Sequence, residues 1–218
     1  PGIVFYQEGV PGNNFRNSFV EKMQKFEPAT MLHRGIRNSY GQGIEKISNC
    51  EGVKVLLGSD DNKGEGECDA MPCVLETSVN HFLNDSNLAI EIFGPATLLV
   101  SYRDRDDLFR VAGELEGQLT ASLFGHAENL DEYEGLIDIL ETKAGRLLFN
   151  QFPTGVEVCE SIVHGGPYPA TTESRSTSVG TGAILRFARP VCFQGFPGDL
   201  LPPELRNENP NKINRKEN

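Results

Sequence analysis

The sequence of 218 residues has 38% hydrophobic and 23% charged residues, which is typical of a folded domain rather than a disordered chain. Its formal net charge of −11 repels nucleic-acid phosphates and anionic membrane surfaces, so we expect no nucleic-acid or membrane partner. No apolar stretch approaches the roughly 20 residues of a membrane span, and no basic-then-apolar leader opens the sequence, which predicts a cytoplasmic protein.

Strand and helix patterns alternate along the first 150 residues. An extended apolar run at 1–5 leads into a predicted turn at 9–14, after which Phe15, Phe19 and Met23 recur at helical spacing until Pro28 ends the helix. The further predicted elements are a helix at 34–48, strands at 53–57 and 71–76 with a polar loop at 59–66 between them, a strand at 96–102, a helix at 105–115, a strand at 119–124, a helix at 131–140 and a strand at 146–149.

This alternation predicts the fold class. Because strand–helix–strand units form right-handed crossovers, we expect an α/β architecture with an open, mostly parallel sheet and helices on both of its faces. From Gly155 onward the sequence is rich in Gly, Pro, Ser and Thr, with one short helical stretch at 183–187, and 202–218 is polar and interrupted by proline. We therefore predict a domain at 1–155 and a segment at 156–218 that carries a loop, a short helix and an extended C-terminal arm.

Cysteine and histidine spacing gives no sign of a metal or redox centre. The five cysteines and four histidines are scattered along the sequence, and none of them forms a CxxC or zinc-type arrangement. We expect free thiols and no metal site, and we interpret the cysteines as structural because small buried thiols are common.

One short motif is more specific than these patterns. Glu91-Ile92-Phe93-Gly94-Pro95, directly before a predicted strand, resembles the Glu-x-Phe-Gly-Pro signature of the aldehyde dehydrogenase superfamily. Three further segments resemble the same family in order: 1–5 the segment after the catalytic cysteine, 119–124 the strand after the next helix, and 145–150 the Gly-x-x-x-x-Asn strand. These matches imply the catalytic-domain fold of that superfamily over 1–150.

The later sequence departs from the common superfamily pattern Pro-Phe-Gly-Gly-x-Lys-x-Ser-Gly. At 164–171 it has His-Gly-Gly-Pro-Tyr-Pro-Ala-Thr, which is similar to the branch that contains 2,5-dioxovalerate (α-ketoglutarate semialdehyde) dehydrogenases and fatty-aldehyde-oxidising relatives. The resemblance implies oxidation of one of these aldehydes to its carboxylate, with NAD or NADP as acceptor, by a homo-oligomer. It selects neither the aldehyde nor the cofactor.

The resemblance also assigns roles in cofactor binding. Glu91 matches the glutamate that accepts hydrogen bonds from the nicotinamide ribose hydroxyls, and Phe93 would lie against the nicotinamide ring. Without the family, the same five residues are the entry to a helix or a strand, with a solvated Glu91 and a core Phe93.

The substrate side is expected further along the sequence. We interpret His164, Gly165, Gly166 and Tyr168 as a substrate-side loop stiffened by the neighbouring prolines. Arg175 is a candidate contact to a substrate carboxylate, and the alternative is that 174–178 forms a helix cap and surface loop.

In the family mechanism a cysteine thiolate attacks the aldehyde, and a hydride then passes to the cofactor. The resemblance places this cysteine just before Pro1 and the nucleotide-binding domain further upstream, so we expect no catalytic residue in this sequence and no activity from it alone. The alternative is a catalytically dead, truncated module that retains only fold and subunit contacts. A surface that lacks the nucleotide-binding domain should expose Ile3, Phe5 and Phe93.

Overall fold

The computed structural model describes residues 2–58, 66–153, 155 and 159–214. The chain divides into two compact units, of which the first comprises Pro1–Val156 with His164–Ser174 and the second comprises Glu157–Val163 with Arg175–Asn218. All of the described strands and α-helices lie in the first unit. None of the described helices combines the length and the apolar character that a membrane crossing requires.

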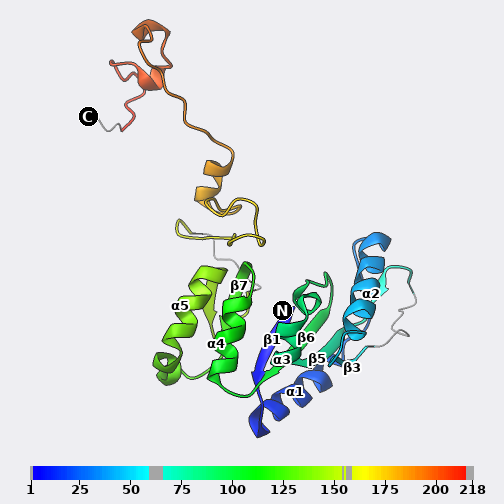
Figure 1. The fold of residues 1–218 in the computed structure, drawn as a ribbon. Helices are drawn as coiled ribbons and strands as arrows, with labels where there is room; N and C mark the ends of the chain where they lie inside the picture. Colours follow the sequence, from blue (N-terminus) through cyan, green and yellow to red (C-terminus); the bar gives the residue numbers. More distant parts are fainter. Residues whose placement is uncertain (1, 59–65, 154, 156–158, 215–218) are drawn as a thin grey trace. The chain divides into compact units, whose positions relative to one another are not determined.

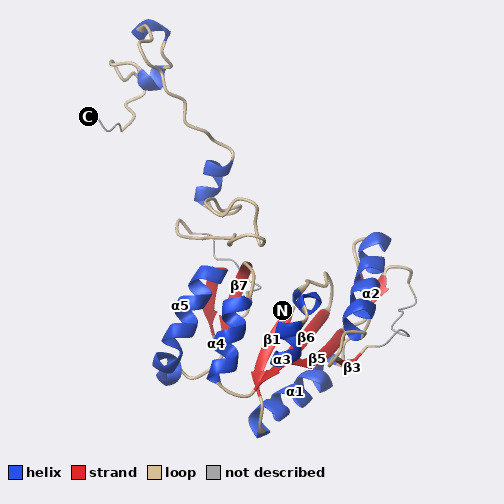
Figure 2. Cartoon of the chain, viewed as in Figure 1, coloured by secondary structure: helices blue, strands red, loops and turns tan. Residues whose placement is uncertain are grey.

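The first unit is built around a four-stranded sheet with the order β1-β6-β5-β3 (Figures 1 and 2). β1 (Ile3–Gln7), β6 (Ala96–Tyr102) and β5 (Cys73–Ser78) run parallel, and β3 (Lys54–Leu57) pairs antiparallel with β5. The predicted open, mostly parallel sheet is therefore confirmed, with one antiparallel strand at its edge.

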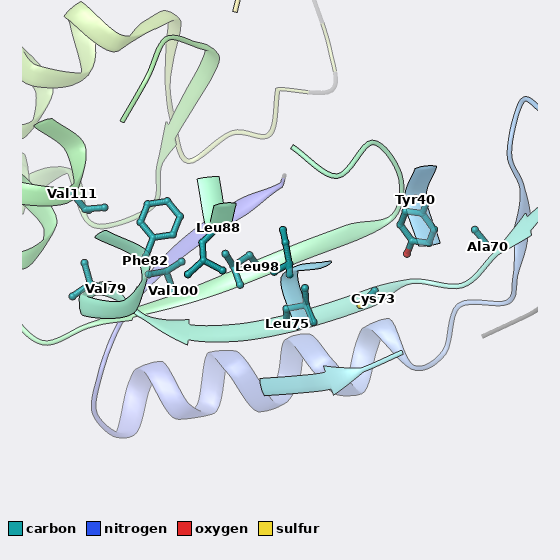
Figure 3. Close-up of a cluster of buried hydrophobic side chains, with 11 residues drawn as sticks. Tyr40, Ala70, Cys73, Leu75, Val79, Phe82, Leu88, Leu98, Val100 and Val111 are labelled. Atoms are coloured by element: carbon teal, nitrogen blue, oxygen red, sulfur yellow. The ribbon is translucent and has the colours of Figure 1, made fainter. Parts of the chain in front are cut away.

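Helices cover both faces of this sheet. Because neighbouring side chains of a strand point to opposite faces, Leu75 and Leu98 pack with α2 (Arg34–Ser48) and α3 (Val79–Asn84) in one core cluster, part of which Figure 3 shows. Val74 and Leu99 pack on the other face, against side chains of α1 (Val10–Met23). The prediction of helices on both faces is confirmed.

The last two strands form a sheet of their own. β7 (Gln118–Leu123) pairs in parallel with β8 (Ala144–Phe149) and with no other described strand, so the strand patterns at 119–124 and 146–149 do not extend the large sheet. α4 (Arg105–Glu114) packs against the cores of both sheets. Its Val111 lies in the large core cluster, whereas its Ala112 packs with α5 (Glu134–Lys143). The 3₁₀ helix η2 (Ala127–Tyr133) precedes α5.

Several local predictions differ from the structure. The turn predicted at 9–14 is wrong, because α1 begins at Val10 and Pro11 occupies its first turn, where a missing N–H costs no hydrogen bond. α3 was not predicted; it is six residues long and is capped by the Ser78 side chain. The pair β2 (Ala29–Thr30) and β4 (Asp69–Ala70) was also missed. The loop predicted at 59–66 lies outside the described residues except for Gly66.

The expected exposure of the first strand is also wrong. Ile3 and Phe5 are partly buried against the large core cluster, because β1 pairs with β6 and the Phe5 ring meets Phe82 edge-on at 5.5 Å between centroids. Phe93, by contrast, is 68% exposed, as expected.

The second unit has short 3₁₀ helices and extended chain in its described part. These helices are η3 (Thr181–Arg186), η4 (Gly198–Leu200) and η5 (Pro203–Leu205), so the helical stretch predicted at 183–187 is a 3₁₀ helix. Large apolar side chains such as Leu185 and Phe187 are exposed there.

Candidate functional site

The residues predicted to bind the cofactor lie together on a loop, the 91–95 loop, between η1 (Ser86–Ala89) and β6. Ile92 packs against the large core cluster, whereas Glu91 and Phe93 on either side of it are exposed. Phe93 is therefore not a core residue, which removes the structural alternative for that side chain. The loop presents a carboxylate and an aromatic ring to solvent on either side of one partly buried residue, Ile92.

The end of this loop is fixed at the entry to the sheet. The backbone N–H of Cys73 donates to the Pro95 carbonyl at 2.9 Å. The Tyr40 hydroxyl donates to the carbonyls of Met71 at 2.7 Å and Pro95 at 3.3 Å. A tyrosine hydroxyl is protonated at neutral pH, and burial raises the pKa of Tyr40 further, so this hydroxyl acts as a donor.

Sequence reasoning missed Tyr40 as a residue that supports the loop. Its place on the apolar face of the predicted helix, in line with Ile36, Ile44 and Ile47, indicated only a core residue. The signal that could have distinguished it is the polar end of the side chain, because a buried tyrosine hydroxyl usually finds a hydrogen-bond partner.

The predicted substrate-side loop lies against the starts of β7 and β8. Gly165 and Gly166 are buried, whereas Tyr168 is 80% exposed. A Cβ atom on Gly145 would collide with the Gly165 carbonyl, and one on Gly166 would collide with the Gln118 carbonyl. Glycine is therefore required here because two backbone segments are in close contact.

The Gly-x-x-x-x-Asn match is explained at both of its ends. Gly145 makes room for the substrate-side loop, and Asn150 lies at the other end of β8 with a left-handed φ of 53°. The Asn150 side chain accepts from the Gly125 N–H at 3.0 Å and donates to the Gly125 carbonyl at 2.9 Å. These residues shape the strand pair.

The predicted site residues thus fall into three groups. Glu91 and Phe93 share one loop at the amino end of β6, and 164–168 lies at the amino ends of β7 and β8, in the same compact unit. Arg175 belongs to the second unit. The cofactor and substrate roles of all these residues stay predictions.

Two of the cysteines lie where the thiolate form is disfavoured. Cys73 is fully buried, and burial raises the pKa of its thiol to about 11, which disfavours the thiolate. Burial and a hydrogen bond to Asp85 raise the pKa of Cys50 as well. Cys159 and Cys192 are exposed residues of the second unit.

Two curated proteins are similar to this chain over 99% of its length. Alpha-ketoglutaric semialdehyde dehydrogenase 2 of Azospirillum brasilense is 42% identical, and alpha-ketoglutaric semialdehyde dehydrogenase of Acinetobacter baylyi is 38% identical. The chain spans 41% of the length of each of these relatives. No family model matches the chain.

Solved structures share the fold. Delta-pyrroline-5-carboxylate dehydrogenase from Mycobacterium tuberculosis, bound with NAD, superposes with a TM-score of 0.67 and 18% identity over 85% of this chain and 34% of its own. Aldehyde dehydrogenase 21 from Physcomitrella patens, in complex with the reaction product succinate, gives a TM-score of 0.58 and 18% identity over 76% of this chain and 33% of its own. The resemblance to aldehyde dehydrogenases that the motif at 91–95 indicated is confirmed in sequence and in fold.

Proposed function

We propose that this chain is part of the catalytic domain of an NAD(P)-dependent aldehyde dehydrogenase that oxidises α-ketoglutarate semialdehyde to its carboxylate. The observation that carries the proposal is the identity of 42% and 38% to two alpha-ketoglutaric semialdehyde dehydrogenases over 99% of the chain. The structural neighbours, at 18% identity, support a shared fold alone. The higher identity to the two curated relatives supports a shared activity as well.

The 91–95 loop fits the nicotinamide half of such a cofactor. The exposed Glu91 carboxylate has no hydrogen-bond partner among the described residues, so both of its oxygens can accept from two vicinal ribose hydroxyls. Phe93 offers an exposed ring two residues away, and its backbone follows the partly buried Ile92. The cofactor, when bound, would accept the hydride from the substrate carbon, and these residues would orient its ring.

The substrate side is proposed at 164–168 and, as a separate proposal for the second unit, Arg175 is the partner of a substrate carboxylate. α-Ketoglutarate semialdehyde carries a carboxylate at the end away from its aldehyde, and a guanidinium is suited to bind it with two parallel hydrogen bonds. A fatty aldehyde has no such group. If α-ketoglutarate semialdehyde is the substrate, the enzyme should strongly prefer an anionic aldehyde over an uncharged aldehyde of similar length.

We further propose that the nucleophilic thiol belongs to a part of the full-length protein outside these 218 residues, so that the chain by itself is inactive. The buried Cys73 and the raised pKa of Cys50 support this assignment. The full-length enzyme is proposed to be a cytoplasmic homo-oligomer, and the free state of all five cysteines fits a reducing compartment.

The test uses the purified full-length protein. We expect formation of reduced cofactor with α-ketoglutarate semialdehyde and either NAD or NADP, and a kcat/KM at least about tenfold lower for an uncharged aliphatic aldehyde, because a lost ionic hydrogen bond is worth about 1.5–3 kcal/mol. A higher kcat/KM for a fatty aldehyde than for α-ketoglutarate semialdehyde would show that a fatty aldehyde is the substrate. No turnover with any aldehyde, despite cofactor binding, would favour a catalytically dead protein.

A further inference from the structure

α2 holds the proposed cofactor loop, although this helix carries no residue of the proposed site. Tyr40 is only 3% exposed, and its single hydroxyl reaches the carbonyls of Met71 and Pro95. Met71 lies just before β5 and Pro95 just before β6. One side chain therefore bridges the entry points of two neighbouring strands, and Figure 3 shows it on the side of the buried cluster away from Val111, next to Ala70.

Two further contacts from α2 set the position of the loop. The Tyr40 ring lies so close to Gly94, whose φ is 153°, that a Cβ atom there would collide with it. One turn further along α2, Gly43 faces Ile92, and a Cβ on Gly43 would lie 3.3 Å from two carbons of that side chain. The helix therefore contacts Ile92, which lies between Glu91 and Phe93, and Gly94, which follows Phe93.

The loop is held at two points. Ile92 packs against the large core cluster, beside a small cavity of about 30 Å³ that Ile47 and Leu88 also line. The hydrogen bond and ring contact of Tyr40 act further along, at Pro95 and Gly94. Tyr40 therefore fixes the end of the loop that Ile92 does not reach.

We propose that Tyr40 is a positioning residue for cofactor binding, which fixes the 91–95 loop so that Glu91 and Phe93 meet the nicotinamide half of the cofactor in one geometry. This inference rests on the proposed function. Tyr40 itself touches neither cofactor nor substrate; it acts through the Pro95 carbonyl and through Gly94.

The test compares Tyr40→Phe with Tyr6→Phe in the full-length enzyme. Both variants remove one hydroxyl from a buried ring, but Tyr6 lies on the other face of the sheet and donates to Glu76 at 2.6 Å. For Tyr40→Phe we expect the Kd of the oxidised cofactor to rise about three- to tenfold, as the loss of one buried hydrogen bond predicts. Amide hydrogen exchange at 91–96 should also become faster. Tyr6→Phe should lower thermal stability without either change.

Acylation of the catalytic thiol by an activated ester separates positioning from general damage. This reaction needs no nicotinamide, so Tyr40→Phe should leave its rate within about twofold of the wild type while hydride transfer slows. If Tyr40→Phe and Tyr6→Phe give equal cofactor affinity and equal exchange at 91–96, the proposal is overturned. Loss of ester acylation in parallel with oxidation would overturn it as well.

Gly43→Ala provides a second variant that does not depend on the tyrosine. Alanine is a better helix former than glycine, so this change should not lower the stability of α2, yet it presses on Ile92. A raised cofactor Kd at unchanged or higher thermal stability supports the positioning role of α2, and an unchanged Kd contradicts it. If the wild type binds neither NAD nor NADP, the proposed function fails together with this inference; if the wild type binds and only the variants fail to differ, the inference alone is wrong.

Discussion

Glu91 differs from the carboxylates of the first unit that accept hydrogen bonds from other side chains. Glu76 is buried and accepts from Tyr6 and Arg16, and Asp107 is buried and accepts from Arg110. Their charges are used within the fold. Glu91 is exposed on an anchored loop, and a carboxylate held in place without a partner among the described residues is suited to bind a ligand.

Glu91→Gln tests that role in the full-length enzyme. The amide keeps one carbonyl acceptor but loses the charge, so hydrogen bonds to the cofactor ribose should weaken by about 1–3 kcal/mol. Misplacement of the nicotinamide by about an ångström can slow hydride transfer on the order of a hundredfold. We expect kcat to fall and the deuterium isotope effect on turnover with deuterated aldehyde to increase. Esterase activity should change little.

Glu51→Gln is the matched control for this prediction, because Glu51 is exposed and the change removes the same charge from the same unit. It should leave the isotope effect at its wild-type value. Equal loss of esterase and dehydrogenase activity in Glu91→Gln would instead assign Glu91 to the acyl-transfer step or to structural support.

At the scale of elements, the sequence predicted those that carry a strong pattern of their own. α2 and β6 have the predicted bounds, because Ile44 and Ile47 recur at helical spacing in the first and a continuous apolar run forms the second. The turn at 9–14 was wrong because Gly and Pro mark helix starts as well as turns. The separate pairing of β7 with β8 depends on long-range packing by α4, which no local pattern records.

The candidate site was predictable only in part for the same reason. The motif at 91–95 was found through the family resemblance, and the exposure of Phe93 agrees with it. The support from Tyr40 and Gly43 comes from a helix about fifty residues earlier in the chain, and sequence periodicity shows that such residues are buried but not what they contact.

Asn150 gives the element-scale prediction, because it closes the β7–β8 pair at one end. Asn150→Ala removes two hydrogen bonds to Gly125 and places a Cβ residue without a compensating side-chain bond at a φ of 53°. We expect the chain to lose about 1–3 kcal/mol of unfolding free energy in denaturant titrations. Asn150→Gly loses the same bonds but tolerates this backbone conformation, so it should be less destabilised by about 1 kcal/mol. Equal losses would show that the conformation contributes nothing.

On the scale of the whole molecule, charge and apolar exposure act against each other. A formal net charge of −11 repels a second copy of the chain. At the same time Phe93 is 68% exposed, and Phe124 and Phe152 are 58% and 64% exposed with their rings 5.1 Å apart. Exposed pairs of large rings are unusual on a soluble monomer and are normally covered by a partner surface.

These two terms predict salt-dependent self-association of the 218-residue chain produced alone. Salt screens the repulsion, since the Debye length falls from about 10 Å at 0.1 M to about 3 Å at 1 M, but it leaves apolar contact intact. Sedimentation velocity should therefore show larger species as salt is raised, together with binding of an apolar dye. Phe124→Ser should reduce both effects, whereas Phe26→Ser, at the same 58% exposure but with no ring stacked on it among the described residues, should reduce them far less. A monomer at high salt that binds no dye would show that these rings are tolerated in water, and the inference that they mark a covered surface would have to be withdrawn.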